Sequence, residues 1–318
     1  MTMHIGHVAL RVTDLDRAVA HLRGVLGLRE RSRSDGQVLL SSNEKHHELQ
    51  LIAADAPGLD HIGLEVETDQ ELEAVRATAL AAGAQLLDGP ADTDGIGTAI
   101  RFTGPPGMLY EVYAGMTRDP LSIHTYLRPG IRKLGHLSFM CENPAQIIAF
   151  WRDGLGFRIS DQAAGGMAWM RCDGDHHGLA VAPRPEGNVL HHYAWQTQDW
   201  AALGQYCDDI ARDGLTLWWG PVRHGPGFNF ATYLPDTDGA IIEVYADLLQ
   251  IPRMRPQPFC PHPAVVPCKE HIYGHDLVAR VDAQVLEGRQ YLGRIIGQGF
   301  HDGQRIPDQQ VALAAAVL

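Results

Sequence analysis

The chain has 318 residues, 45% of them hydrophobic and 20% charged, so it is long enough for two domains with substantial cores. Its net charge of −12 argues against a nucleic-acid-binding surface and against adhesion to anionic lipid. No apolar run approaches the ~20 residues of a membrane span, and the start lacks the regions of a signal peptide, so we expect a cytoplasmic protein.

The first expected strand carries a pattern that occurs four times along the chain: HVAL (7–10), HIGL (61–64), HLSF (136–139) and HYAW (192–195). Each copy runs histidine, apolar, small, apolar. Because alternate residues of a strand share a face, each histidine should lie beside a small residue on one side of its strand. The pattern predicts a sheet with space on the face that carries the histidines.

The spacing of these strands indicates that the two halves of the chain are copies. The segments YEVYAG (110–115) and IEVYAD (242–247) place Glu111 and Glu243 at matching positions. From His7 to His61 to Glu111 the steps are 54 and 50 residues, and from His136 to His192 to Glu243 they are 56 and 51.

Four segments with helical spacing follow the four histidine strands: 15–27, 70–84, 144–156 and 199–214. Asp14, Asn143 and Asp199 are the expected N-caps, and each segment ends at or near a glycine. We therefore predict an α+β fold of four βαβββ modules paired into two domains. The predicted boundaries are residues 1–115, a linker at 116–133, residues 134–248 and a C-terminal extension at 249–318.

The extension matches neither copy. A proline-rich stretch precedes apolar residues at helical spacing, so we expect a lid over the pocket or a subunit contact. Cys260, His262, Cys268 and His271 lie among prolines at a spacing typical of no zinc site, which disfavours one there. The chain has five cysteines and no C-x-x-C pair, so we expect reduced thiols.

The end of the second copy predicts a β-hairpin, because two runs of aromatic and β-branched residues flank the turn formers PDTDG. If Leu234 pairs with Ala240, Tyr233 lies diagonally across from Glu243 on the same face. The same register puts the small Ala231 opposite Glu243, leaving space for a metal ion or a substrate.

With these motifs, residues 4–250 resemble the vicinal oxygen chelate superfamily, and within it the two-domain type I extradiol catechol dioxygenases. The resemblance implies two barrel-like domains, with Fe(II), or Mn(II) as the alternative, bound in the second one. The implied metal ligands are His136, His192 and Glu243. The implied catalytic residues are His177 in HHGLAV, His224 in the loop before the hairpin, and Tyr233, ten residues before the glutamate.

The chemistry of these residue types agrees with the resemblance. Two imidazoles and one carboxylate leave three adjacent positions open on a metal, which is the facial triad of non-haem Fe(II) oxygenases. A catechol would take two positions and O₂ the third, so the predicted partners are a catechol-type substrate and O₂. His177 would stabilise charge and shuttle a proton, and His224 and Tyr233 would orient a substrate hydroxyl. The family also implies a homo-oligomer.

Some assignments have alternatives. A single histidine on a strand is more often structural than a ligand, and it is the matched set that favours a metal. His176 competes with His177, and His191 with His192. The H-x-x-A strand and the fourfold pattern favour His177 and His192, and we expect their neighbours to face outward.

The sequence of the first half contains a matching set of candidate metal ligands, His7, His61 and Glu111, and His47 stands at the place of His177. However, Arg101 stands where the second half has Tyr233, and Thr93 where it has His224. The resemblance implies that this half is a scaffold that has lost its metal, with a second occupied site as the alternative.

Three classes of function fit such modules. The leading prediction is an extradiol dioxygenase that cleaves the ring of a catechol. Glyoxalase-like isomerases and lyases share the modules, but lack the group formed by His177, His224 and Tyr233. Drug-binding resistance proteins have a single pair of modules and no complete triad.

Overall fold

The computed structural model describes residues 3–88, 93–119 and 130–251. The expected helix of the C-terminal extension and the group from Cys260 to His271 lie outside these residues, as does most of the predicted linker. None of the helices in the described part is long and apolar enough to cross a membrane.

The first half consists of two modules in which one strand, one helix and three strands follow each other. The first module is β1 (Met3–Val12), α1 (Leu15–Leu26), β2 (Arg29–Ser34), β3 (Gln37–Ser41) and β4 (Leu49–Ala53). The second is β5 (Gly58–Val66), α2 (Asp69–Ala81), β6 (Gln85–Leu86), β7 (Ile96–Gly104) and β8 (Met108–Met116).

The second half repeats this order. Its first module is β9 (Ile131–Cys141), α3 (Pro144–Asp153), β10 (Arg158–Ala163), β11 (Met167–Arg171) and β12 (Leu179–Pro183). Its second is β13 (Val189–Thr197), α4 (Trp200–Arg212), β14 (Trp219–Arg223), β15 (Phe230–Pro235) and β16 (Ile241–Ala246). The predicted α+β fold of four βαβββ modules is confirmed, although β9 begins three residues before the predicted start of the second half.

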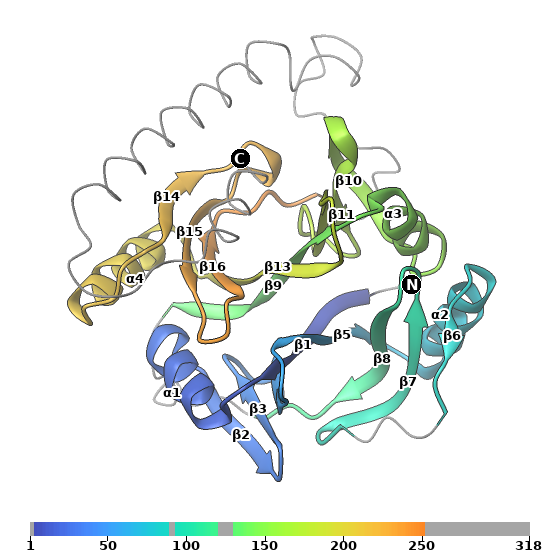
Figure 1. Cartoon of the computed structure of the whole chain (residues 1–318), viewed down its shortest axis with the longest axis horizontal. Coiled ribbons are helices and arrows are strands. Elements are labelled where there is room, and N and C mark those ends of the chain that lie inside the picture. Colours follow the sequence, from blue (N-terminus) through green and yellow to red (C-terminus); the bar gives the residue numbers. More distant parts are fainter. Residues whose placement is uncertain (1–2, 89–92, 120–129, 252–318) are drawn as a thin grey trace. The chain divides into compact units, whose positions relative to one another are not determined.

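Each half forms one mixed sheet of eight strands (Figure 1). The orders are β2-β3-β4-β1-β5-β8-β7-β6 and β10-β11-β12-β9-β13-β16-β15-β14, so the two sheets have the same topology. In each, the first strands of the two modules pair antiparallel at the centre, and each of them pairs parallel with the last strand of its own module. The four histidine strands of the sequence pattern are these central strands.

The helices begin where the sequence predicts. Asp14, Asn143 and Asp199 each accept a hydrogen bond from a backbone N–H in the first turn, which stabilises that end of the helix. In α1 the buried residues recur at helical spacing, and Leu22 is 3% exposed. Burying one such side chain stabilises the fold by about 1.5–3 kcal/mol. Gly27 ends this helix with φ of 67°, a conformation that favours glycine.

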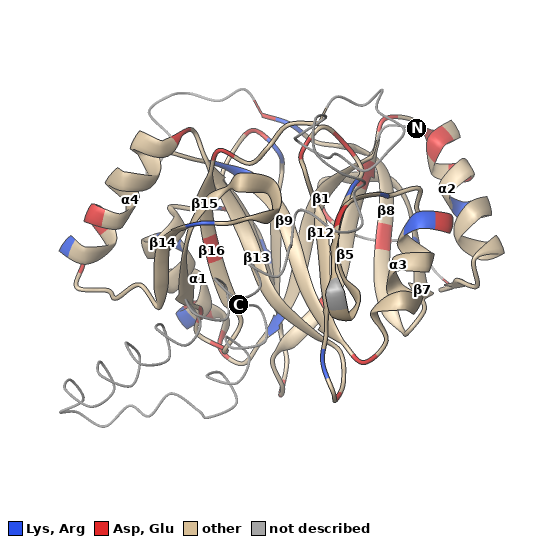
Figure 2. Ribbon diagram, turned by 90° about the horizontal axis from the view of Figure 1, so that it is seen from above, with Lys and Arg blue, Asp and Glu red and all other residues tan. Residues whose placement is uncertain are grey.

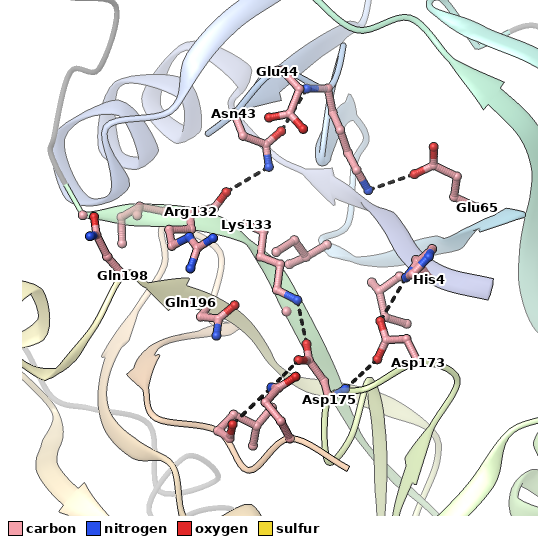
Figure 3. A pocket seen from close by; sticks show the side chains of 18 of the residues that line it. His4, Asn43, Glu44, Glu65, Arg132, Lys133, Asp173, Asp175, Gln196 and Gln198 are labelled. Atoms are coloured by element: carbon pink, nitrogen blue, oxygen red, sulfur yellow. Dashed lines mark hydrogen bonds and ion pairs between the residues drawn. The ribbon is translucent and has the colours of Figure 1, made fainter. Parts of the chain in front are cut away.

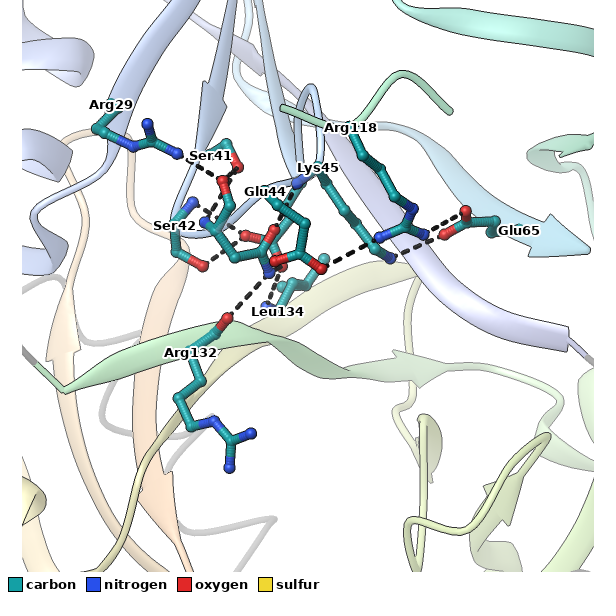
Figure 4. Close-up of polar contacts among 11 residues, drawn as sticks. Arg29, Ser41, Ser42, Glu44, Lys45, Glu65, Arg118, Arg132 and Leu134 are labelled. Atoms are coloured by element: carbon teal, nitrogen blue, oxygen red, sulfur yellow. Dashed lines mark hydrogen bonds and ion pairs between the residues drawn. The ribbon is translucent and has the colours of Figure 1, made fainter. Parts of the chain in front are cut away.

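The two halves share one apolar core, and β1 and β5 of the first half contact β9 and β13 of the second. Buried hydrogen bonds also join them. Trp151 donates its indole N–H to the Tyr110 hydroxyl at 2.8 Å. Near the edge of this interface, Asn43 donates to the carbonyl of Arg132, and Glu48 accepts from the backbone N–H of Leu134 (Figure 4). The contacts hold the two sheets against each other.

A polar cleft of about 1050 Å³ lies between the halves, lined among others by His4, Lys45 and Glu65 from the first and Lys133, Asp173 and Asp175 from the second. These charges are largely paired. Lys133 bonds Asp175 at 2.6 Å, and His4 bonds Asp173 at 3.1 Å across the two halves (Figure 3). Lys and Arg residues are interspersed with Asp and Glu along the described ribbon (Figure 2). None of the predicted metal ligands lines this cleft.

Candidate metal centre

The three predicted ligands of the second half come from neighbouring strands of one sheet. His136 lies on β9, His192 on β13 and Glu243 on β16. In the sheet, Ala194 of β13 is paired with both His136 and Glu243, and Ser138 of β9 is paired with His192. A small side chain therefore stands across from each ligand, as the repeated strand pattern predicts, and the three larger side chains meet above them.

The ligand atoms converge on the carboxylate. Oε2 of Glu243 lies 3.0 Å from Nε2 of His136 and 3.1 Å from Nε2 of His192, and the three atoms are all within 4.8 Å of one another. All three residues are buried. Two imidazole nitrogens and a carboxylate oxygen form a donor set that suits Fe(II) or Mn(II), and their mutual closeness fits a shared ion.

The charge of Glu243 is stabilised in place. Burial alone would raise the pKa of its carboxyl group, but His136 and His192 outweigh this effect and hold that pKa well below its usual range. Its second oxygen, Oε1, accepts a hydrogen bond of 2.9 Å from the Nδ2 of Asn229, which is 2% exposed. The carboxylate thus turns one anchored oxygen outward and one oxygen toward the histidines.

Each ligand histidine is supported by a neighbouring ring. His136 packs against Tyr245, with ring centroids 4.9 Å apart. Nδ1 of His192 lies 2.7 Å from Nδ1 of His191. The prediction that His191 faces outward is wrong: it is 3% exposed. The pairing of β13 with β9 shifts between Leu190 and His192, and this irregularity brings both side chains inward.

His177 lies beside the triad and is held by a chain of two further residues. Its ring centroid is 4.3 Å from that of His136. Its Nδ1 lies 3.1 Å from Nδ1 of His176, and Nε2 of His176 donates to Asp161 at 3.0 Å. His176 is 1% exposed, so the prediction that it faces outward is also wrong. It lies in the loop before β12, where the alternation of a strand does not apply.

The hydrogen bonds from Asp161 through His176 to His177 determine which nitrogen of His177 carries the proton. Asp161 accepts only, so Nε2 of His176 carries a proton, and the Nδ1 of neutral His176 is an acceptor. Nδ1 of His177 must then donate to it, which leaves Nε2 of neutral His177 with a lone pair. Burial, followed by the nearby His136, lowers the pKa of His177 well below its ordinary value, so the neutral form prevails at neutral pH.

Tyr233 and His224 form a pair on the other side of the triad. Nε2 of His224 lies 2.5 Å from the Tyr233 hydroxyl, and the Tyr233 ring lies edge-on to His192 at 5.8 Å. Trp219 stacks on Tyr233 with ring centroids 5.1 Å apart. Burial, and then the charge of Glu243, raises the pKa of Tyr233 well above its usual value. The hydroxyl is therefore a neutral donor.

The hairpin forms, but its predicted register is wrong by two residues. Tyr233 is paired directly with Glu243, Leu234 with Ile242, and Ala231 with Tyr245. Asp236 explains the difference, because its side chain accepts the backbone N–H groups of Asp238 and Ala240 and so holds a turn that starts one residue later than predicted, after the pair of Pro235 and Ile241. A shift of two residues keeps every side chain on its face, so Tyr233 and Glu243 still share one.

The sequence reasoning missed two polar residues of the site, Asn229 and Asp161. Asn229 lies just before β15, four residues before Tyr233, and shares the face of the hairpin that carries it. That even spacing would have identified Asn229 from the sequence as a neighbour of the site. Asp161 lies on β10 and reaches the site through His176, a connection that depends on how β10, β11 and β12 pair.

The family model for the Glyoxalase/Bleomycin resistance protein/Dioxygenase superfamily matches residues 4–112 and 133–244. The chain belongs to this superfamily. The two matched segments coincide with the two sheets, and each contains one set of two histidines and one glutamate.

Comparisons with individual members point to ring-cleaving enzymes. The "Manganese-dependent 2,3-dihydroxybiphenyl 1,2-dioxygenase" of Geobacillus genomosp. 3 is 28% identical over 256 residues, which cover 73% of this chain and 80% of the relative. Other related sequences are named metapyrocatechase and iron-dependent extradiol dioxygenase. The predicted resemblance to vicinal oxygen chelate proteins, with extradiol dioxygenases among the relatives, is confirmed.

Two solved structures of the superfamily have the same arrangement over most of their length. The 2,3-dioxygenase LapB from Pseudomonas sp. KL28 is 25% identical, with a TM-score of 0.72 over 80% of this chain and 96% of that one. The Mn(II)-bound glyoxalase from Novosphingobium aromaticivorans is 27% identical, with a TM-score of 0.73 over 82% of this chain and 88% of that one. Among the related proteins, the names of two include manganese and the name of one includes iron.

Proposed function

We propose that the chain is an extradiol dioxygenase that opens the aromatic ring of a catechol-type substrate with O₂. The observation that carries this proposal is the arrangement around Glu243, where a buried triad of two histidines and a carboxylate is flanked by His177 on one side and by the His224–Tyr233 pair on the other. The names of the related dioxygenases support it. In this proposal residues 134–248 are the catalytic domain and residues 1–115 its partner domain.

The metal ion would be Fe(II), with Mn(II) as the alternative, held by His136, His192 and Glu243. Such an ion supplies the binding of both catechol oxygens and the electron transfer to O₂ that amino-acid side chains cannot perform. The protein contributes everything else: it holds the ligands, orients the substrate, and moves a proton.

Tyr233 and His224 are the residues proposed to orient the substrate. The Tyr233 hydroxyl lies on the same face as Glu243 and keeps its proton, so it can donate a hydrogen bond to a catechol oxygen. In this role Nε2–H of His224 donates to the Tyr233 oxygen, which fixes the hydroxyl in place and leaves its hydrogen for the substrate. Trp219, stacked on Tyr233, adds an apolar wall against which an aromatic ring can pack.

His177 is the residue proposed to handle the proton of the reaction. Its Nε2 carries a lone pair and its Nδ1 is tethered through His176 to Asp161. A substrate hydroxyl that loses its proton on binding can transfer it to this nitrogen, and His176 and Asp161 stabilise the imidazolium that forms. The same nitrogen can later return the proton to the product.

The test is a catechol panel. The protein is loaded anaerobically with Fe(II) or Mn(II), exposed to air with simple, alkyl- and aryl-substituted catechols, and followed for the yellow ring-opened product. We expect a product from at least one catechol with the wild-type protein and none with Glu243→Ala. Absence of product from every catechol with either metal, with metal bound, would contradict the proposal. Isomerisation of a glutathione hemithioacetal under the same conditions would favour the glyoxalase-like alternative.

A further inference from the structure

The first half contains a second cluster of metal-binding residues, formed by His7 on β1, His61 on β5 and Glu111 on β8. Nε2 of His7 lies 3.0 Å from Nε2 of His61, and Oε2 of Glu111 lies 3.4 Å and 3.8 Å from these two nitrogens. As in the second half, the three atoms are within 4.8 Å of one another, and all three residues are at most 1% exposed. The proposed dioxygenase activity does not use this cluster.

We propose that His7, His61 and Glu111 bind a second divalent metal ion of the manganese, iron and zinc class. The ion is structural, and the site is independent of the proposed catalytic function. The proposal departs from the scaffold role that the family resemblance implies for this half.

The oxygen of Glu111 that faces the histidines has no other partner. Oε2 is fully buried and makes no hydrogen bond among the described residues. Leaving a buried carboxylate oxygen without a partner is costly, because the group loses its hydration and gains nothing in return. A cation between Oε2 and the two Nε2 atoms satisfies it.

Arg101 does not occupy the position of the ion. Its guanidinium bonds the other oxygen of Glu111, Oε1, at 2.6–2.7 Å, and Thr93 donates to the same oxygen at 3.0 Å. Arg101 is paired with Glu111 across β7 and β8, as Tyr233 is with Glu243. Together with Thr93 it does for Oε1 what Asn229 does in the second half. In both halves these neighbours contact Oε1 and leave the oxygen that faces the histidines, Oε2, to those histidines.

His61 is oriented as a ligand by Asp60. Its Nδ1 donates to Oδ1 of Asp60 at 2.8 Å, so Nε2 is the nitrogen left to bind an ion, and it lies 3.0 Å from Nε2 of His7 and 3.8 Å from Oε2 of Glu111. A carboxylate that fixes the tautomer of a histidine in this way is a common partner of metal-binding histidines. In the second half His191 is the neighbour of the corresponding histidine, His192. The carboxylate of Asp60 is a stronger hydrogen-bond acceptor than the imidazole of His191.

The backbone around the first cluster also leaves space for these rings. Gly63 is paired with His7, and a Cβ at Gly63 would lie 2.2 Å from Nδ1 of His7. Ala9 is paired with His61. Gly63 and Ala9 are each smaller than the residues at the matching positions of the second half, Ala194 and Ser138. The first cluster therefore has at least as much space across from its histidines.

Two features distinguish this ion from the catalytic one. The positive charge of Arg101 repels a cation, so the first site binds metal more weakly than the second. Arg101 and Thr93 stand where the second half has Tyr233 and His224, so these two positions lack the tyrosine and the histidine that are proposed to orient a substrate.

The experiment counts Mn(II) bound to the metal-free protein, using the signal of free Mn(II) in electron paramagnetic resonance. We expect two ions on the wild-type chain and one on Glu243→Ala. We expect none on Glu243→Ala/Glu111→Gln or on Glu243→Ala/His61→Asn. Arg101→Gln in the Glu243→Ala background keeps a donor to Glu111 and removes the charge, so it should tighten binding about tenfold or more.

Mn(II) should also raise the Tm of Glu243→Ala but not that of its two double variants, and circular dichroism reports whether each variant is folded. A folded Glu243→Ala chain that binds no Mn(II), with or without Arg101→Gln, would overturn the proposal. The proposal would also be overturned if both double variants, Glu243→Ala/Glu111→Gln and Glu243→Ala/His61→Asn, still bound the Mn(II) ion. Failure of the dioxygenase assay would leave this count unchanged, so the two proposals fail separately.

Discussion

Replacing His177 by phenylalanine separates proton handling from metal binding. The side chain is 4% exposed and phenylalanine has a similar shape, so the pocket should keep its packing. The substitution removes one hydrogen bond to His176, worth about 0.5–1.5 kcal/mol of stability. It also removes Nε2 of His177, the nitrogen that is proposed to exchange a proton with the substrate.

The expected loss is in turnover. Acid–base assistance by a positioned side chain contributes about 10²–10⁴-fold, which corresponds to about 3–5.5 kcal/mol of activation free energy. We therefore expect His177→Phe to lower kcat by that factor. Metal content should stay at the wild-type level, because neither nitrogen of His177 belongs to the cluster of ligand atoms.

The assay combines metal analysis with the rate of yellow product formation on the same preparation. Asp161→Asn is the matched control: it retains His177 and His176 but weakens the tether, so it should lose less activity than His177→Phe. If His177→Phe loses its metal ion, His177 is a ligand and the assignment of His192 has to be revised.

Three further predictions follow from single contacts. Asn229→Ala removes the donor to Glu243 and should weaken metal affinity about 10–100-fold in a metal titration, while an unchanged affinity would refute the anchoring role. Tyr233→Phe removes one hydroxyl and should lower kcat by about tenfold in the catechol assay, less than His177→Phe. Burial raises the pKa of Asp236 to about 6, above its unfolded value near 3.9, so ionising it in the folded state lowers stability as the pH rises between these values. In denaturant titrations Asp236→Asn should therefore gain stability relative to wild type from pH 4 to pH 7.5, by at most about 3 kcal/mol, and a constant difference would contradict this.

The sequence predicts the fold well because the information is repeated. Four copies of one strand pattern at nearly equal spacing determine the four modules. The nearly equal steps from histidine to histidine to glutamate, 54 and 50 residues in one half and 56 and 51 in the other, indicate that the two halves are copies. The helix starts at Asp14, Asn143 and Asp199 follow from local capping chemistry, which does not depend on distant contacts.

The errors concern places where local alternation fails. His191 lies at an irregularity of β13, and His176 lies in a loop, so neither obeys the two-residue period from which an outward direction was predicted. The hairpin register depends on the side chain of Asp236, which holds the turn one residue later in the chain. Composition alone does not reveal that contact.

The polar contacts that complete the site were the least predictable. Asn229 contacts Glu243 across the hairpin and Asp161 contacts His176 across β10, β11 and β12, so both contacts depend on strand pairing, and single residues of these types occur throughout a chain. In the first half, the sequence showed that Arg101 replaces Tyr233. The structure adds that Arg101 bonds the outer oxygen of Glu111 and leaves the inner one open.

The most direct test of the central claim is the mass of the product formed under ¹⁸O₂. A dioxygenase centred on His136, His192 and Glu243 should place both atoms of one O₂ molecule in the ring-opened product, and Glu243→Ala should form none. A product that contains no ¹⁸O, or an equal yield of labelled product from Glu243→Ala, would contradict the account.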